Sequence, residues 1–163
     1  MKRACFTGHR NVEDSGTADL RQRLISILER GITNEGLTDF YAGGAIGWDT
    51  MCAEAVLALK EKYGHIKLHM VLPCSNREQT YRWTREQQKT FYEILSQADT
   101  VEYTSDSYYQ GCMKVRNARL VELADICFCY LDKSKKKSGT AQTVRMALKK
   151  HIMVVNFWRD TSE

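Results

Sequence analysis

Three short segments of this sequence combine residue types that suit an anionic ligand: residues 7–10, 43–49 and 138–140. Their candidate binding residues are Thr7, Gly8, His9, Arg10, Gly43, Gly44, Gly47, Trp48, Asp49, Ser138, Gly139 and Thr140. Glycine lets a phosphate come close to the unpaired backbone N–H groups at the start of a helix, where the helix dipole also favours negative charge. Hydroxyl and guanidinium groups donate hydrogen bonds to the same ligands. The chemistry that these segments indicate is the binding of phosphate or carboxylate.

Each segment also has an interpretation without a ligand. Arg10 could meet a phosphate bidentately, and His9 could donate a hydrogen bond, stack on a base or transfer a proton. The alternative is a polar loop in which His9 caps nearby backbone. For residues 43–49 the alternative is a tight strand-to-helix turn that binds nothing. The residues alone leave both alternatives open.

The elements around these segments alternate between strand and helix. Apolar runs predict strands at residues 3–6, 40–42, 67–72, 126–131 and 152–157, with a weaker strand at 98–103. Helical periodicity predicts helices at residues 18–30, 51–62, 78–97, 113–124 and 141–150. This alternation predicts an α/β protein with a parallel sheet covered on both faces. The three segments then fall at the carboxyl ends of strands and meet only if the fifth strand lies near the first.

Two further regions carry aromatic residues that could contact a base. Gln79, Trp83 and Gln87 are spaced to share one face of the helix predicted at 78–97. We expect Trp83 to pack on the sheet, with stacking on a base as the alternative. Residues 104–111 are polar and include Tyr109, so a functional loop is expected there.

The composition is that of an ordinary globular protein. The chain is 43% apolar and 27% charged. Its net charge of +4 is well below the strongly positive charge that is typical of a dedicated duplex-DNA-binding protein. Pro73 is the only proline and no low-complexity stretch divides the chain, so one domain over residues 1–163 is expected. Lys2 and Arg3 are not followed by the apolar region of a signal peptide, and no apolar run could cross a bilayer. A cytoplasmic location without membrane contact is expected.

The six cysteines show neither a CxxC pair nor the spacing of a zinc site: Cys5, Cys52, Cys74, Cys112, Cys127 and Cys129. Buried free thiols in a reducing compartment explain them better than a redox role. Neither a metal site nor a cofactor is expected.

Taken in order, segments 7–10, 43–49, 109–117 and 138–140, with Gln79 and Trp83, resemble the SLOG superfamily over nearly the whole chain. The greatest similarity is to its small bacterial families of the YpsA and YoqJ type, whose function is unknown. The resemblance implies a single-domain, three-layer Rossmann-like fold with a mostly parallel sheet of about six strands. It also implies a nucleotide or nucleotide-derived ligand in the crevice, and a homodimer.

The resemblance extends to the LOG enzymes, which cleave cytokinin-type nucleoside monophosphates into base and ribose phosphate. Their pattern has an Arg-Lys pair on a helix and then Pro-Gly-Gly-x-Gly-Thr-x-x-Glu. Here Arg116 and Asn117 align with the pair, and Ser138-Gly139-Thr140 with the Gly-Thr loop. The LOG lysine is replaced by Asn117, and a lysine-rich loop stands in place of Pro-Gly-Gly.

The glutamate of the LOG pattern is missing as well. Thr143 occupies its position, so the carboxylate that cleavage of an N-glycosidic bond needs is absent. Asp49, Asp132 or Glu54 could supply one from another loop. Arg116 and Asp49 are therefore the candidate catalytic residues, if a reaction is catalysed at all.

Three functions remain open. The first is a module that binds or senses a nucleotide or nucleotide-derived ligand and passes the signal to a protein partner. In it Arg10 and Arg116 neutralise charge, while Trp48 or Tyr109 contacts the base. The second is an N-glycosidase, or phosphoribohydrolase, acting on nucleoside monophosphates. The third is binding of single-stranded nucleic acid, against which the nearly balanced charge argues.

Overall fold

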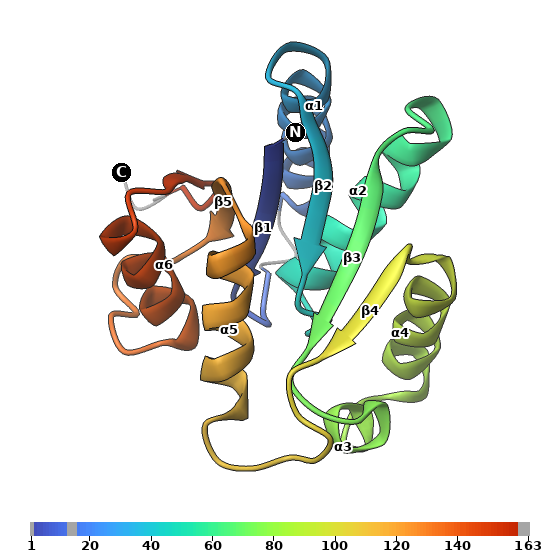
Figure 1. The fold of residues 1–163 in the computed structure, drawn as a ribbon, viewed down its shortest axis with the longest axis vertical. Coiled ribbons are helices and arrows are strands. Elements are labelled where there is room, and N and C mark those ends of the chain that lie inside the picture. Colours follow the sequence, from blue (N-terminus) through green and yellow to red (C-terminus); the bar gives the residue numbers. More distant parts are fainter. Residues whose placement is uncertain (1, 13–15, 160–163) are drawn as a thin grey trace.

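The computed structural model describes residues 2–12 and 16–159, and within them strands and helices alternate (Figure 1). The strands are β1 (Lys2–Gly8), β2 (Leu37–Ala42), β3 (Lys67–Leu72), β4 (Thr100–Tyr103), β5 (Ile126–Tyr130) and β6 (Met153–Asn156). The helices are α1 (Thr17–Asn34), α2 (Trp48–Lys62), α3 (Asn76–Thr80), α4 (Arg85–Gln97), α5 (Cys112–Leu123) and α6 (Gly139–Lys149). The predicted α/β class is confirmed.

All the strands of this part of the chain pair in parallel in one sheet, in the order β4-β3-β2-β1-β5-β6. The chain builds outward from β1 to β4 and then crosses back to place β5 beside β1, where Cys5 is in register with Cys127 and Gly8 with Tyr130. The order reverses between β1 and β5, and such a switch point opens a ligand crevice at the carboxyl ends of the strands. The fold is the Rossmann-like arrangement that was expected.

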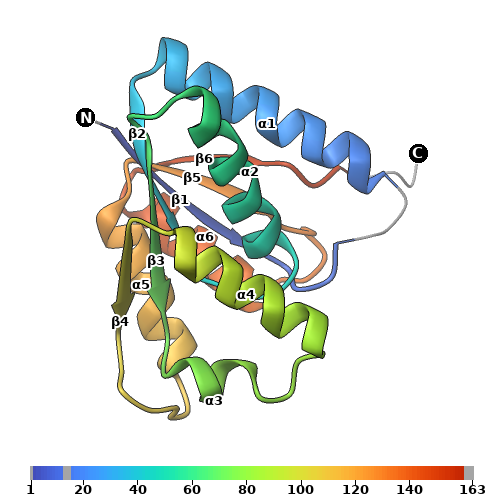
Figure 2. The same ribbon diagram turned by 90° about the vertical axis from the view of Figure 1, so that its right-hand side faces the viewer.

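Helices cover both faces of the sheet. Figures 1 and 2 show α1, α2 and α4 on one face, and α5 and α6 on the other. Because side chains alternate along a strand, β1 sends Phe6 into the core beneath α1 and α2 and Cys5 into the core beneath α5 and α6. The two cores hold the loops at the carboxyl edge in fixed positions.

The helix predicted at residues 78–97 is wrong in one respect, because the chain breaks it into α3 and α4. Thr84 begins α4 with a capping box: its hydroxyl accepts the N–H of Gln87 at 3.1 Å, and the Gln87 side chain accepts the N–H of Thr84 at 3.0 Å. Gln79, Trp83 and Gln87 therefore do not share a helix face. Trp83 packs edge-on against Phe91, with ring centroids 5.5 Å apart, as the packing interpretation expected.

The six cysteines are buried and unpaired, which confirms the prediction of buried thiols. Burial raises the pKa of the Cys52 thiol well above its ordinary value and that of Cys129 to about 12, so neither forms the reactive thiolate readily. Within the described residues, no helix has both the length and the apolar character needed to span a bilayer.

Candidate functional site

A cavity of about 210 Å³ opens at the carboxyl edge of the sheet, at the switch point between β1 and β5. All three segments singled out in the sequence contribute to its walls, together with α5. The predicted binding residues that line it are Thr7, Gly8, His9, Arg10, Asp49, Arg116, Asn117, Ser138, Gly139 and Thr140. The structure therefore brings together side chains that lie up to 133 positions apart in the chain.

Arg116 on α5 is the buried cation of this cavity, and only 5% of its surface is exposed. Its Nε donates to the side-chain oxygen of Asn117 at 2.8 Å, its Nη1 to the carbonyl of Gly43, and its Nη2 to the Met113 sulfur at 3.8 Å. Among the described residues, no carboxylate lies close enough to form an ion pair with it. Burial lowers the pKa of Arg116, and the negative charge of nearby Asp49 partly offsets this by raising it. The guanidinium stays charged but is bound to uncharged acceptors.

Asp49, in the first turn of α2, is the carboxyl group on the same wall. Its Oδ2 accepts the backbone N–H of Ala45 at 3.2 Å. Burial raises the pKa of Asp49 to about 6, and this rise would be larger without Arg116, the Ala45 hydrogen bond and Arg10, which lower the pKa. The Asp49 carboxyl thus accepts the hydrogen bond of a backbone N–H in the glycine-rich turn, where the sequence had predicted an external anion.

The glycines of that turn are explained by contacts within the protein. A Cβ on Gly43 would lie 2.5 Å from Nη1 of Arg116, and one on Gly44 would lie 2.6 Å from the Leu72 side chain. Gly47 has a φ of 82°, and a Cβ there would lie 2.2 Å from the carbonyl oxygen of Arg10. Neither Gly43 nor Gly44 lines the cavity, and Gly47 lines a different one. Their prediction as ligand contacts stays untested, but close packing alone requires these glycines.

The start of α6 has the geometry expected of an anion site. Ser138 caps the helix by accepting the Ala141 N–H at 3.1 Å, which leaves the N–H groups of Gly139 and Thr140 without a partner in that cap. A Cβ on Gly139 would meet nothing within 4 Å, so the protein itself does not require glycine there. This helix start, and not that of α2, is the open cradle.

His9 holds the loop that leads into α6. Its Nε2 accepts the backbone N–H of Asp132 at 2.9 Å, so the imidazole is neutral and Nδ1 carries the proton. Burial, followed by the charge of Lys135, lowers the pKa of His9, against the opposing charge of Asp132. The interpretation of His9 as a residue that pairs with backbone is therefore correct, although its ring also lines the cavity.

Two of the predicted base contacts are not placed to make them. Trp48 is fully buried, and its indole N–H donates to the Phe128 carbonyl at 3.3 Å. Its ring packs against Tyr130 and Phe157, so the prediction that Trp48 contacts a base is wrong for this structure. Tyr109 is exposed in the loop before α5 and does not line the cavity.

The sequence did not single out three further lining residues, Phe6, Ala45 and Met113. Met113 stands three positions before Arg116, on the same face of α5, so helical spacing could have found it. Gln79 also went unassigned: its Nε2 donates to the Gly44 carbonyl at 3.2 Å. Its Oε1 is the only buried side-chain oxygen or nitrogen of the described residues that has no hydrogen-bond partner. The hydrogen bond from Gln79 to Gly44 holds the glycine-rich turn in place.

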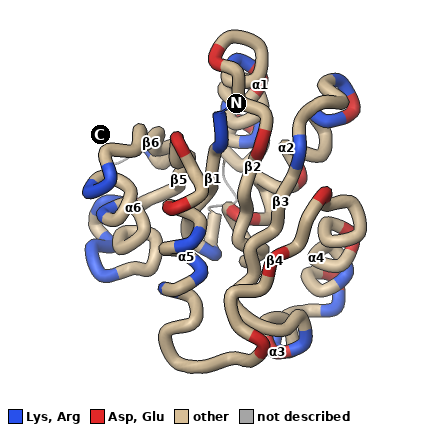
Figure 3. Tube along the Cα trace, in the orientation of Figure 1, with Lys and Arg blue, Asp and Glu red and all other residues tan. Residues whose placement is uncertain are grey.

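The positive charge of this edge is concentrated beside the start of α6. Lys133, Lys135, Lys136 and Lys137 are exposed in the loop between β5 and α6. Figure 3 shows this group of basic residues next to α6. The field at the cavity is therefore more positive than the net charge of the chain suggests.

Fold and cavity together define a Rossmann-like protein with a crevice at its switch point. Residues 4–157 match the YspA SLOG family, YpsA, and the chain belongs to that family. This confirms the resemblance found in the sequence.

Similar proteins occur in several bacteria. A UPF0398 protein of Brevibacillus brevis is 30% identical over 122 residues, covering 71% of this chain and 63% of that protein. The prophage-derived protein YoqJ of Bacillus subtilis is 27% identical over 152 residues and covers 86% of both chains. The chain thus spans less than two thirds of the length of the UPF0398 relative but most of YoqJ.

Two solved structures share the fold. DNA processing protein A of Helicobacter pylori, described with a single-stranded DNA binding mode, has a TM-score of 0.69 at 23% identity, over 99% of this chain and 67% of that one. The protein TM1055 has a TM-score of 0.58 at 17% identity, over 94% of this chain and 72% of that one.

Proposed function

We propose that this protein binds a nucleotide or nucleotide-derived ligand, with the phosphate held between Arg116 and the start of α6. The observation that carries the proposal is the state of Arg116, which is buried and charged and, among the described residues, makes no direct ion pair with a carboxylate, although the charge of nearby Asp49 favours its charged form. Breaking a buried ion pair by removing one partner costs about 3–5 kcal/mol, because the remaining charge is uncompensated. A bound phosphate would supply an anion in direct contact with the guanidinium.

The groups around Arg116 complete a phosphate site. The N–H groups of Gly139 and Thr140 open the positive end of α6 into the same cavity. No hydrogen bond within the described residues engages the hydroxyl of Thr7 or Thr140, although both residues line this cavity. The Asp49 carboxyl on the same wall is suited to accept hydrogen bonds from ribose hydroxyls. A sugar phosphate fits this set better than a free anion does.

The test is calorimetric titration with AMP, GMP and inorganic phosphate. We expect a nucleotide to bind more tightly than inorganic phosphate and to raise the melting temperature, since a ligand of the native state stabilises it by mass action. Arg116→Gln should lower the affinity by about tenfold or more, because a charge-assisted contact is lost. Arg119→Gln is the matched control on the same helix, since Arg119 pairs with Glu102 and does not line the cavity.

The proposal fails if millimolar nucleotide neither binds nor shifts the melting temperature of the wild-type protein. It also fails if Arg116→Gln and Arg119→Gln bind equally well. The proposal includes a homodimer, which light scattering of the free and the nucleotide-loaded protein tests.

A second candidate function, cleavage of the N-glycosidic bond of a nucleoside monophosphate, is favoured by Asp49. A carboxyl with a pKa of about 6 is suited to proton transfer near neutral pH, and it lines the cavity beside Arg116. Chromatography of AMP incubations should then show free adenine, and Asp49→Asn should abolish its release while AMP still binds. If no base is released from any of AMP, GMP, CMP and UMP, the protein is a binding module.

A third candidate, binding of single-stranded nucleic acid, draws support from the distribution of charge. Exposed lysines fill the loop at 133–137, and Tyr108 and Tyr109 are exposed before α5. Such cations and aromatic rings are the elements of a single-strand groove. Fluorescence anisotropy with an oligothymidine at about 50 and 200 mM salt should then show steeply weakening affinity. Equal binding of AMP and oligothymidine per phosphate would favour the mononucleotide site.

A further inference from the structure

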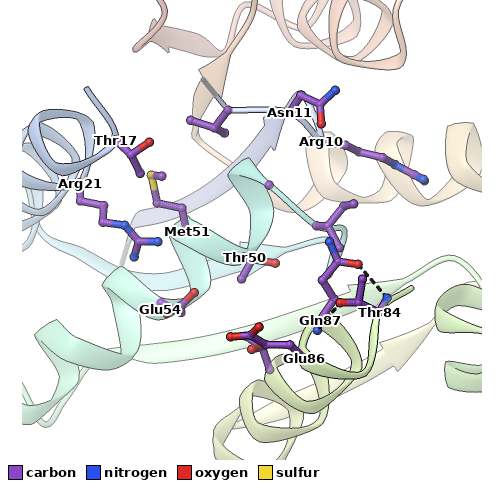
Figure 4. A pocket seen from close by; sticks show the side chains of 14 residues that line it. Arg10, Asn11, Thr17, Arg21, Thr50, Met51, Glu54, Thr84, Glu86 and Gln87 are labelled. Carbon is purple, nitrogen blue, oxygen red and sulfur yellow. Dashed lines mark hydrogen bonds between the residues drawn. The ribbon is translucent and has the colours of Figure 1, made fainter. Parts of the chain in front are cut away.

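A second cleft, of about 490 Å³, lies at the same edge of the sheet on the side of α1, α2 and α4. Its walls come from the loops after β1 and β2 and from the first two turns of these three helices (Figure 4). Arg10 lines both this cleft and the smaller cavity. The two hollows are therefore neighbours that share one cationic side chain.

A ridge of backbone separates the two hollows. The Trp48 N–H donates to the His9 carbonyl at 3.2 Å, and the backbone of Gly47 lies so close to Arg10 that a Cβ would come within 2.2 Å of its carbonyl oxygen. No side chain fits between these segments. A ligand that occupies both hollows must cross over the ridge beside the side chain of Arg10.

The two hollows differ in chemistry. The smaller one gathers Arg116, Arg10 and the start of α6, which suit phosphate. The larger one gathers the carboxylates of Glu54 and Glu86 and the guanidinium of Arg21, with Thr50 and Thr84 also on its walls (Figure 4). This balanced set of donors and acceptors suits an uncharged, hydrogen-bonding group such as a nucleoside.

The volumes agree with this division. Small-molecule sites usually measure about 300–1,000 Å³. The smaller cavity, at about 210 Å³, is below that range, whereas the larger cleft, at about 490 Å³, is within it. The cavity around Arg116 alone is tight for a whole ligand of drug-like size.

We propose that the ligand is a dinucleotide whose first phosphate and sugar occupy the cavity at Arg116, whose second nucleoside occupies the cleft between α1, α2 and α4, and whose linkage passes Arg10. This inference rests on the proposed nucleotide site and adds its second half. The larger cleft is then a specificity site, which distinguishes a two-part ligand from a mononucleotide.

The experiment compares mononucleotides with their pyrophosphate-linked dimers. AMP, GMP, diadenosine diphosphate and diguanosine diphosphate are titrated calorimetrically into the wild-type protein and two variants. Thr90→Trp fills the larger cleft, and Lys89→Trp places the same ring on the neighbouring, exposed position of α4. We expect at least one dimer to bind about tenfold more tightly than its monomer. Thr90→Trp should remove that advantage and leave monomer affinity unchanged, and Lys89→Trp should change neither.

Glu54→Gln provides a second variant if Thr90→Trp does not fold, and it should lower dimer affinity alone. Equal affinities of dimers and monomers overturn the inference but leave the proposed function intact. The same holds if Thr90→Trp or Glu54→Gln weakens monomer and dimer by the same factor. If neither monomers nor dimers bind, the proposed function fails and the inference with it.

Discussion

The backbone N–H of Asp132 donates a hydrogen bond of 2.9 Å to Nε2 of His9. This contact ties the loop after β1 to the loop before α6, which are the two loops on either side of the candidate phosphate site. A protonated imidazole has no acceptor nitrogen, so the contact exists only while His9 is neutral. The geometry of the site is thereby linked to pH.

The first prediction follows from the lowered pKa of His9. As the pH falls through the ordinary value of 6.5, the unfolded chain takes up a proton that native His9 resists, so stability decreases. The contribution of His9 to stability is complete at pH values above 6.5, and it is lost progressively until the pH lies below the pKa of His9 in the folded protein. His9→Gln keeps an acceptor and does not titrate. Urea midpoints measured at about pH 5 and 7.5 should show that the wild type loses stability relative to His9→Gln at the lower pH. The same change in midpoint for both proteins between the two pH values would contradict this.

The second prediction has the opposite sign, because the pKa of Asp49 is raised from 3.8 to about 6. Between these values the unfolded chain has released a proton that the native state keeps, so stability falls as the pH rises. The shift corresponds to about 3 kcal/mol at pH 7. Asp49→Asn removes this cost and still accepts the Ala45 N–H.

Urea denaturation of Asp49→Asn and wild type between about pH 4 and 7 tests this. The variant should gain stability over the wild type steadily as the pH rises, and should be the more stable protein at pH 7 by up to about 3 kcal/mol. Ser96→Ala, at an exposed position of α4 where the hydroxyl donates to the backbone carbonyl of Glu93 and to no carboxylate, serves as a control with no expected change in slope. A constant difference between variant and wild type across the range would show that Asp49 is already ionised in the native state.

The arrangement of the site could be predicted from the sequence because it depends on the order of strands and loops. Alternating strands and helices put residues 7–10 and 138–140 at the carboxyl ends of parallel strands. The pairing of β5 with β1 then brings the two segments together. The break after α3 was harder, because no proline or glycine marks it. Its signal was the capping box formed by Thr84 and Gln87, which can be recognised in a sequence.

The roles of Gly43 and Trp48 could not be predicted from local pattern. A glycine in a turn indicates that a Cβ is not tolerated, but it does not say whether a ligand or the protein fills the space. Here Arg116, 73 positions away, fills it. Similarly, a tryptophan at the start of a helix could face the crevice or the core. Gly8, whose Cβ would lie 2.3 Å from the indole, makes room for Trp48 inside.

The third prediction concerns Trp48. Trp48→Phe leaves a void and deprives the Phe128 carbonyl of its N–H donor, so we expect a loss of roughly 1–3 kcal/mol. Nucleotide affinity should stay unchanged, since the ring is fully buried. Circular dichroism in urea measures the stability, and calorimetry at a temperature where both proteins are folded measures the affinity. Weaker binding by a folded Trp48→Phe protein would show that the ring contacts the ligand after all.

The fourth prediction separates the glycines that pack the protein from the one that faces the ligand. Gly43→Ala places a Cβ 2.5 Å from Nη1 of Arg116 and 2.9 Å from Oδ2 of Asp49, so the guanidinium must move. Stability should fall by roughly 1–3 kcal/mol, and nucleotide affinity should fall with it. At Gly139 a Cβ meets no protein atom within 4 Å, and alanine favours helix over glycine, so Gly139→Ala should be at least as stable as wild type.

Gly139→Ala should nevertheless bind nucleotide more weakly, because its methyl group stands where a phosphate would approach the first N–H groups of α6. Melting curves and AMP titrations on both alanine variants check the pair of outcomes. Gly64→Ala is the control, since Gly64 also has open space around its Cβ and lies far from the cavity in the loop after α2. If Gly139→Ala binds AMP as wild type does, the phosphate does not lie on α6. Arg116 would then have to hold its anion from another direction.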